Sequence, residues 1–190
     1  MIKLIVALGN PGKEYEFTRH NIAWLSFDEF FESQKNIIWK NKFKGEYTEI
    51  SYGDQKIYFL KPHTYMNLSG ESVQALCSFF KIIPSEIFVI HDEIDLDWGK
   101  IVLKKGGGHA GHNGLKSMAQ HLGSSEFLRL RLGIGKPVHG SVSSWVLGSF
   151  AGDQVIELER ILKTSSEIIH SVMKNGFEKT ASQFSGKTIL

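Results

Sequence analysis

The sequence contains a single cysteine, Cys77, so the chain can form no internal disulfide. Cys77 stands in an apolar stretch, where a small buried side chain is a commoner role than a reactive thiol. No apolar run approaches the roughly 20 residues that a membrane-spanning helix needs. The N-terminus begins a strand-like pattern and lacks the layout of a signal peptide. We therefore expect a cytoplasmic protein with no membrane association.

The sequence also lacks internal repeats, low-complexity segments and any linker long enough to separate two domains. Its 190 residues suffice for one domain with a full core. The hydrophobic share of 42% and the charged share of 22% are ordinary for a soluble globular protein. We predict one domain over residues 1–190, with a frayed tail after about residue 185.

Acidic residues are scarce in one part of the chain. Between residues 99 and 136 there are seven lysines or arginines but only one acid, Glu126. A second basic cluster consists of Lys40, Lys42 and Lys44. Although the net charge is only +2, this asymmetry indicates a polyanionic partner. A solvated basic face, balanced by the acidic C-terminal helix, explains the same charges equally well.

Hydrophobic periodicity predicts strands and helices that intermix along the chain. Strands are expected at residues 2–8, 46–52, 56–60, 86–91, 100–105 and 127–134. Helices are expected at residues 20–34, 67–80, 115–122, 153–174 and 177–184. Residues 39–45 are expected to form a connector, and residues 137–144 a mobile loop. The pattern predicts an α/β fold, with a twisted, mixed and mostly parallel sheet flanked by helices in three layers, α/β/α.

Residues with reactive or hydrogen-bonding side chains gather where the predicted strands end. The segment from Asn10 to His20 follows the first strand, and Asp92 follows the 86–91 strand. The segment from His109 to Asn113 follows the 100–105 strand. Ligands of open α/β sheets bind outside the carboxyl ends of the strands. We therefore expect the three segments to form one cleft.

His20 and Asp92 are the candidates for catalysis. A histidine beside a carboxylate can act as a general base, because the carboxylate fixes its tautomer and orientation. No Gly-x-Ser-x-Gly motif is present, so a hydrolase built on this pair would activate water directly. Neutral donors for the oxyanion would then be the amides of Asn10, Asn67 and Asn113. Taken singly, each of these asparagines is more often a turn or cap residue.

The glycine-rich loop from Gly106 to Gly114 contains His109 and His112, and several acids lie in residues 92–97. These side chains are of the types that bind metals, but their spacing matches no strong metal-binding signature. We therefore expect no metal and no other cofactor. The loop enters a predicted helix, so its backbone N–H groups can hold a phosphate or another polar group.

Six short motifs stand out when the chain is taken as a whole. They are Leu8-Gly-Asn-Pro-Gly12, Thr18-Arg-His-Asn21, Pro62-x-Thr-Tyr-Met-Asn-Leu-Ser-Gly70, His91-Asp-Glu-Ile-Asp-Leu96, Gly106-Gly-Gly-His-Ala-Gly-His-Asn-Gly-Leu-Lys116 and Leu130-Arg-Leu-Gly-Ile-Gly135. In their order and roughly in their spacing, these motifs closely resemble the bacterial peptidyl-tRNA hydrolase family. The resemblance covers nearly the whole chain, and the six motifs together are far more specific than any one of them.

The resemblance implies a small cytoplasmic α/β enzyme of translation, usually monomeric, that needs no metal. Such enzymes hydrolyse the ester between a peptide and the 3′ ribose of tRNA, which recycles tRNA from peptides dropped by stalled ribosomes. By resemblance, His20 activates water, Asp92 keeps His20 basic, and Asn10 helps to distinguish blocked aminoacyl groups from free ones. The other matched positions bind the peptide, the tRNA 3′ end or phosphates of the tRNA; they are Tyr15, Tyr65, Asn67, Asn113, Lys104 and Arg131.

Four positions depart from the family's pattern. At one of them, Tyr65, the family commonly has Phe, which keeps the ring. The family often has glycine where Ala23 and Ala110 stand, and a basic residue where Val102 stands. Each alanine adds only a methyl group, so we expect retained function with small loop adjustments. Lys100 or Lys105 can supply the charge that Val102 lacks.

Two rival functions are compatible with the sequence. One is a nucleic-acid-binding relative that has the fold but no turnover, which the presence of both His20 and Asp92 disfavours. The other is a metal-dependent amidase or peptidase, which would be excluded by an activity that resists a chelator.

Overall fold

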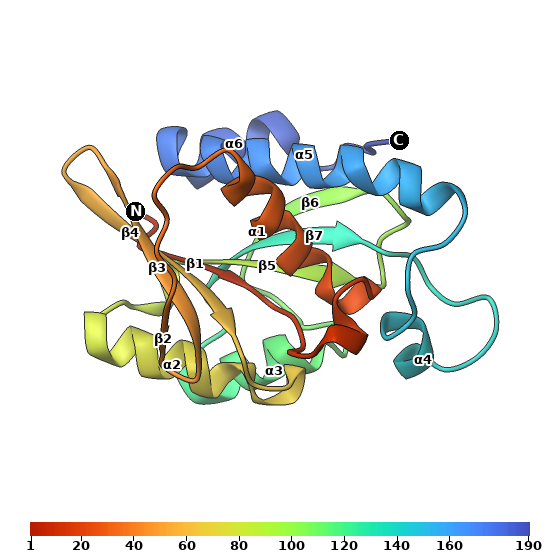
Figure 1. Ribbon diagram of the computed structural model, residues 1–190, viewed down its shortest axis with the longest axis horizontal. Helices are drawn as coiled ribbons and strands as arrows, with labels where there is room; N and C mark the ends of the chain where they lie inside the picture. Colours follow the sequence, from red (N-terminus) through yellow and green to blue (C-terminus); the bar gives the residue numbers. More distant parts are fainter.

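Seven strands form one mixed sheet in the computed structural model, which describes residues 1–190 (Figure 1). The strands are β1 (Leu4–Ala7), β2 (Lys40–Lys42), β3 (Gly45–Tyr52), β4 (Gln55–Pro62), β5 (Ile87–Glu93), β6 (Ile101–Lys105) and β7 (Leu128–Gly133). Their order across the sheet is β2-β3-β4-β1-β5-β7-β6. The central strands β4, β1, β5 and β7 are parallel, while β2, β3 and β6 add antiparallel pairings at the edges. The predicted mixed sheet, with a mostly parallel centre, is confirmed.

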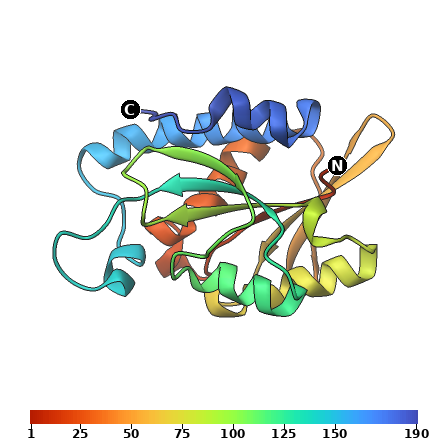
Figure 2. The same ribbon diagram turned by 180° about the vertical axis from the view of Figure 1, so that it is seen from behind.

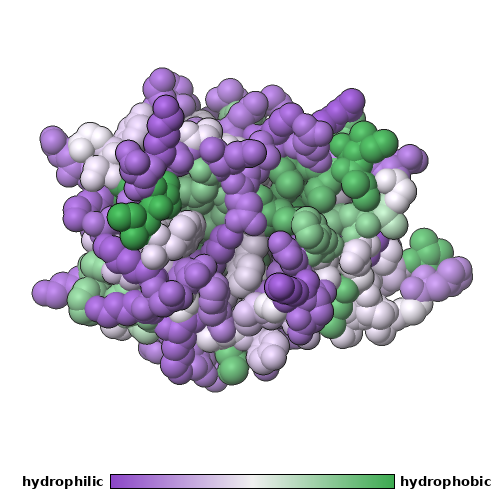
Figure 3. All heavy atoms as spheres, viewed as in Figure 1, coloured by the Kyte–Doolittle hydropathy of each residue, from purple (hydrophilic) through white to green (hydrophobic).

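Helices cover both faces of this sheet. They are α1 (Ile22–Glu32), α2 (Ser69–Phe80), α3 (Asn113–Leu122), α4 (Val142–Val146), α5 (Asp153–Asn175) and α6 (Phe177–Phe184). Figure 1 and Figure 2 show α1, α5 and α6 over one face, and α2 and α3 over the other. The predicted three-layer arrangement is therefore confirmed. No helix has the length and apolar character to cross a membrane, and hydrophilic side chains cover much of the face drawn in Figure 3.

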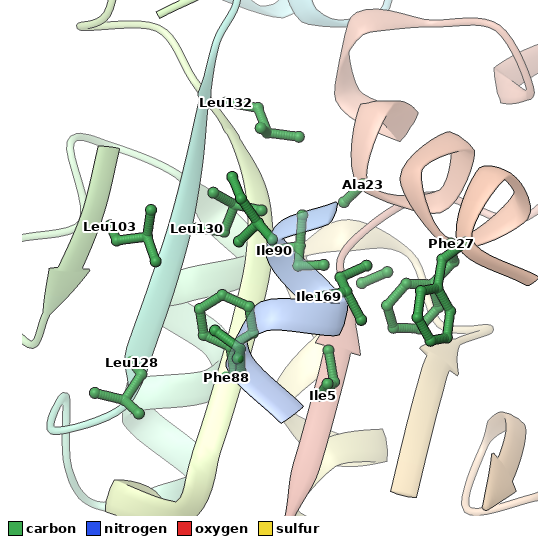
Figure 4. Close-up of a cluster of buried hydrophobic side chains, with 14 of the residues drawn as sticks. Ile5, Ala23, Phe27, Phe88, Ile90, Leu103, Leu128, Leu130, Leu132 and Ile169 are labelled. Carbon is green, nitrogen blue, oxygen red and sulfur yellow. The ribbon is translucent and has the colours of Figure 1, made fainter. Parts of the chain in front are cut away.

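Successive residues of the central strands face opposite helical layers. In β1, Ile5 packs into the core beneath α1 and α5, while Val6 packs into the core beneath α2 and α3. Figure 4 shows Ile5, Phe88 and Ile90 gathered around Ile169 of α5. Each such side chain is fully buried, which stabilises the fold by about 1.5–3 kcal/mol per residue. Burial on both faces explains why these strands are continuous apolar runs in the sequence.

Two elements occupy segments that we expected to lack regular structure. β2 lies within the predicted connector 39–45 and pairs with the first residues of β3. Its side chains are all exposed, so backbone hydrogen bonds hold it and no apolar pattern marks it. α4 replaces part of the expected loop 137–144, and its N-cap residue Ser141 accepts a hydrogen bond from the backbone of Ser144 at 3.1 Å.

The C-terminal tail lies along the outer edge of β6, while its fraying after about residue 185 stays a prediction. The backbone N–H of Ile101 donates to Lys187 at 2.9 Å, and that of Gly186 donates to Ile101 at 2.8 Å. A further backbone bond joins Ile189 to Gly99 at 2.9 Å. β6 is the last strand of the sheet, so its outer N–H and C=O groups lack a strand partner. The tail satisfies them.

Candidate active site

The loop that follows β1 is closed by a pair of asparagines. The backbone N–H of Asn10 donates to Oδ1 of Asn21 at 2.8 Å, and Nδ2 of Asn21 donates to the carbonyl oxygen of Asn10 at 2.9 Å. Short 3₁₀ turns at Lys13–Tyr15 and Arg19–Asn21 make up much of the loop between them. Because the two ends of the loop are tied together, His20 is held close to Asn10.

The structure brings His20 and Asp92 together, although they are 72 positions apart. Asp92 lies near the carboxyl end of β5 and is 2% exposed. Its Oδ1 is 2.8 Å from Nδ1 of His20. An ionised carboxylate can only accept, so Nδ1 of His20 carries the proton. Nε2 of the neutral ring is left as the basic nitrogen, in a side chain that lines a cleft.

Each member of this pair shifts the protonation of the other. Burial lowers the pKa of His20, but the charge of Asp92 and the hydrogen bond to it outweigh burial and raise that pKa above its ordinary value. Burial raises the pKa of Asp92, yet electrostatic attraction and hydrogen bonds from two histidines hold that pKa far below its ordinary value. Asp92 is therefore a carboxylate throughout the physiological range, and it strengthens His20 as a base.

The second histidine on Asp92 is His112, which the sequence places in the expected cleft and among possible metal ligands but does not connect with Asp92. Its Nε2 lies 2.9 Å from the same Oδ1 that His20 contacts. Its Nδ1 accepts a hydrogen bond from the backbone N–H of Leu115 at 3.3 Å, so His112 is the N-cap of α3. The sequence signal that could have identified it is its place at a helix start, within a loop already expected in the cleft.

His20, Asp92 and His112 are close enough to raise the question of a metal site, because one ligand atom from each lies within 4.8 Å of the others. Their hydrogen bonds argue against coordination. Nδ1 of His112 is an acceptor, so the proton of the neutral ring is on Nε2, the atom that faces Asp92. A protonated nitrogen has no lone pair for a metal ion. This arrangement therefore favours a hydrogen-bonded network.

The glycine-rich loop reaches the cleft by a route that the strand-exit argument did not foresee. β5 and β7 are parallel, and β6 is antiparallel to both. The carboxyl end of β6 therefore lies at the opposite end of the strands from Asp92. The loop must run back across the sheet before α3 begins. Buried Arg129 holds this return path, donating from Nη1 to the carbonyl oxygen of Gly108 at 3.0 Å and from Nη2 to that of Gly106.

A cleft of about 620 Å³ collects most of the side chains that the sequence singled out. Those that line it are Asn10, Tyr15, His20, Tyr65, Asn67, Asp92 and Asn113. The cleft also has a wall from α4, which contributes Val142, Val146 and the following Leu147. Sequence reasoning missed this wall, because a five-residue helix has too few turns to show an amphipathic pattern. The result is one polar floor and one largely apolar side.

Close packing of α2 against α3 positions the asparagines. The backbone N–H of Gly70 donates to Oγ of Ser117 at 2.9 Å. A Cβ atom on Gly70 would lie 2.1 Å from the carbonyl oxygen of Ser117, so only glycine fits there. Asn67 precedes α2 and Asn113 begins α3, and the close approach of the helices brings both to the cleft.

Lys104 and Arg131 lie outside the lining of the cleft. Lys104 is exposed on β6 and makes no salt bridge. Arg131 on β7 donates from Nε to Oε2 of Glu93 at 3.0 Å, and its side chain is only 17% exposed. Val102 is the register partner of Arg131 on β6. The two residues predicted to bind phosphates therefore differ, since Lys104 makes no ion pair and Arg131 is paired with Glu93.

Comparison with known proteins gives a consistent result. The peptidyl-tRNA hydrolase family model matches residues 4–189. The peptidyl-tRNA hydrolase of Citrifermentans bemidjiense is 43% identical over 185 residues, which cover 97% of this chain and 98% of the relative. That of Geotalea uraniireducens is 42% identical over 189 residues, covering 100% and 99%. The crystal structure of peptidyl-tRNA hydrolase from Acinetobacter baumannii is similar with a TM-score of 0.91 at 34% identity, covering 100% of this chain and 97% of that one.

Proposed function

The chain belongs to the peptidyl-tRNA hydrolase family, and we propose that it hydrolyses the ester between a peptide, or an N-blocked amino acid, and the 3′ ribose of tRNA. The observation that carries the proposal is the 2.8 Å contact between His20 and Asp92 in a cleft lined by three asparagines. The enzyme acts as a monomer without a cofactor, and its product is free tRNA.

His20 is the general base in this mechanism. Its Nε2 takes a proton from water while the water oxygen attacks the ester carbonyl carbon. Asp92 stabilises the imidazolium that forms and keeps the ring oriented. When the tetrahedral intermediate collapses, the ester C–O bond breaks, and the ribose oxygen leaves with the proton that His20 held.

Asn10 is placed to select blocked substrates. Its Oδ1 accepts a hydrogen bond from the backbone N–H of Met66 at 2.8 Å, which leaves the Nδ2 amide as the available group. Nδ2 can only donate, and a blocked amino group offers it a carbonyl oxygen. A free α-ammonium offers only donors, so the unblocked ester binds with an unpaired amide.

The remaining cleft residues bind the two arms of the substrate. Asn67 and Asn113 donate to the peptide and to the 3′ end of the RNA, and their amides stabilise the developing oxyanion. Tyr15 and Tyr65 give stacking surfaces to unpaired bases, and Tyr65 is 59% exposed. Lys104 and Arg131 meet phosphates of the acceptor stem outside the cleft.

Hydrolysis of N-acetyl-aminoacyl-tRNA, measured beside the unblocked aminoacyl-tRNA with EDTA present, tests this function. We expect cleavage of the blocked ester alone, and a loss of at least about 100-fold in His20→Ala with the fold retained. Cleavage of both esters would refute the role of Asn10. Binding of tRNA without cleavage would establish the nucleic-acid-binding rival, and a reaction stopped by EDTA would establish the metal-dependent one.

A further inference from the structure

One oxygen of Asp92 serves two histidines. Nδ1 of His20 lies 2.8 Å from Oδ1, and Nε2 of His112 lies 2.9 Å from the same atom. The centroids of the two imidazole rings are 5.0 Å apart. No side-chain donor reaches Oδ2. The two N–H groups therefore donate to the same negatively charged oxygen atom.

The tautomer of His112 is fixed by the start of α3. Because Nδ1 accepts the N–H of Leu115 at 3.3 Å, the ring proton is on Nε2 and points to Asp92. Two tasks are thus joined in one side chain, the cap of a helix and a donor to the catalytic carboxylate. Each task uses a different nitrogen, so substitutions can separate them.

A second donor changes what the carboxylate does to His20. A hydrogen bond to an ionised oxygen stabilises that charge and makes the carboxylate a weaker acceptor for any other donor. Asp92 consequently attracts the protonated form of His20 less strongly than an unshared carboxylate would. The effect opposes the raising of the pKa of His20 by Asp92 and keeps more of the base free at neutral pH.

The other charged and titratable groups around His20 are already engaged. Glu93 is paired with Arg131, and Arg19 donates from Nη2 to Gln154 at 2.9 Å. His91 donates from Nδ1 to the carbonyl oxygen of Asp92 at 2.7 Å, and burial holds its pKa well below the ordinary value. Tyr15 is the remaining titratable group of the same loop in the cleft. Asp92 and His112 are therefore the groups that set the protonation of His20.

We propose that His112 is a positioning residue that shares Oδ1 of Asp92 with His20, holds the carboxylate in place, and keeps His20 in its basic form at a lower pH. The inference rests on the proposed role of His20 as the general base. The glycine-rich loop, through His112, thus affects the protonation of His20, in addition to any contact with phosphate.

Two substitutions separate the tasks of His112. His112→Asn keeps a good N-cap residue, but its amide is too short to reach Asp92. His112→Gln loses the preferred cap, but its Nε2 has about the reach of the histidine Nε2 and can donate to Asp92. His109→Asn is the matched control, because His109 lies in the same loop and contacts Ser125 at 3.0 Å, away from Asp92.

The readouts are the acid limb of kcat/KM against pH and an NMR titration of the His20 ring. We expect His112→Asn to move both to higher pH by roughly half a unit to one unit, His112→Gln to restore most of the shift, and His109→Asn to change neither. An unchanged His20 titration in His112→Asn overturns the proposal. So does a larger shift in His112→Gln than in His112→Asn, which would mean that the cap alone matters.

The NMR titration needs no substrate, so it tests the sharing of Asp92 even in a variant that is inactive. If the wild-type protein failed to cleave the blocked ester, the proposed function would fail while the titration still decided the role of His112. Melting temperatures of the three variants identify any that do not fold. If His112→Asn does not fold, His112→Ala takes its place, because alanine also has no donor for Asp92 and should give the same upward shift of the His20 titration.

Discussion

The guanidinium of Arg19 lies over the indole ring of Trp145, with its Cζ atom 3.8 Å from the ring centroid. Nη1 of Arg19 also donates to the carbonyl oxygen of Trp145 at 3.3 Å, and its backbone N–H donates to Gly148 at 3.0 Å. Arg19 is the residue before His20, and Trp145 belongs to α4. The apolar wall of the cleft is thus attached to the segment that carries the proposed base.

Trp145→Leu should loosen this wall without touching the His20–Asp92 pair. A desolvated cation–π contact contributes up to about 2 kcal/mol, and the variant also loses the hydrogen bond from Nε1 to Gly135. We expect KM for N-blocked aminoacyl-tRNA to rise several-fold with a smaller change in kcat. Steady-state kinetics checks this, with Trp39→Leu as the control because Trp39 packs against Phe31 and does not line the cleft. A fall in kcat alone would contradict the assignment.

Asp92→Asn should move the acid limb of activity to lower pH. The charge and hydrogen bond of Asp92 raise the pKa of His20, and burial lowers it. A neutral residue at position 92 removes the charge that raises the pKa of His20, while burial still lowers that pKa. His20 is then unprotonated at lower pH, but it is a weaker base. We expect the plateau of kcat/KM to fall on the order of 100-fold. If the acid limb of the pH–rate profile stays in place or moves to higher pH, a group other than His20 sets it.

The same carboxylate should make the fold sensitive to acid. The folded pKa of Asp92 lies below the ordinary value of 3.8, so its contribution to stability is present above about pH 4 and is lost as the pH falls through the lowered pKa. His20 has the opposite sign, because its raised pKa gives stability that is lost as the pH rises through that value. Urea unfolding between pH 2 and 8 should show a flatter acid side in Asp92→Asn than in the wild type.

Lys104 and Arg131 should respond differently to removal. Lys104→Ala removes a free surface cation, so we expect unchanged stability and a salt dependence of tRNA binding that is shallower by about one phosphate contact. Arg131→Ala leaves the buried carboxylate of Glu93 without its partner, which costs on the order of 3 kcal/mol. Binding titrations at several salt concentrations and melting curves distinguish the two. Equal loss of stability in both variants would contradict the structure.

Ala110→Gly should stabilise the protein slightly. Ala110 has a φ of 48°, in the left-handed region that costs a residue with a Cβ about 1 kcal/mol or more. Part of that gain is lost because glycine has more freedom in the unfolded chain. We therefore expect a gain of up to about 1 kcal/mol in the free energy of unfolding, with activity retained. Gly123→Ala, at a φ of 65°, is the matched opposite change and should destabilise the protein.

Much of the fold follows from local patterns that the sequence displays. The buried runs around Ile5 and Phe88 could form only central strands, and the stripe of α5 is long enough to be unmistakable. β2 and α4 were missed because backbone hydrogen bonds and a single turn hold them, without an apolar repeat. The pairing of the tail beyond residue 185 could not be predicted, because its partner is the free edge of β6, which no local pattern records.

The sequence by itself determined the family, the layered fold and the identity of most side chains in the cleft, because motifs and periodicity are local properties of the chain. Only the tertiary structure decided which of these groups touch. It placed His112 on the oxygen that His20 uses, paired Arg131 with Glu93, and carried the glycine-rich loop back across the sheet. Such contacts depend on strand direction and helix crossing, and these are set by long-range packing.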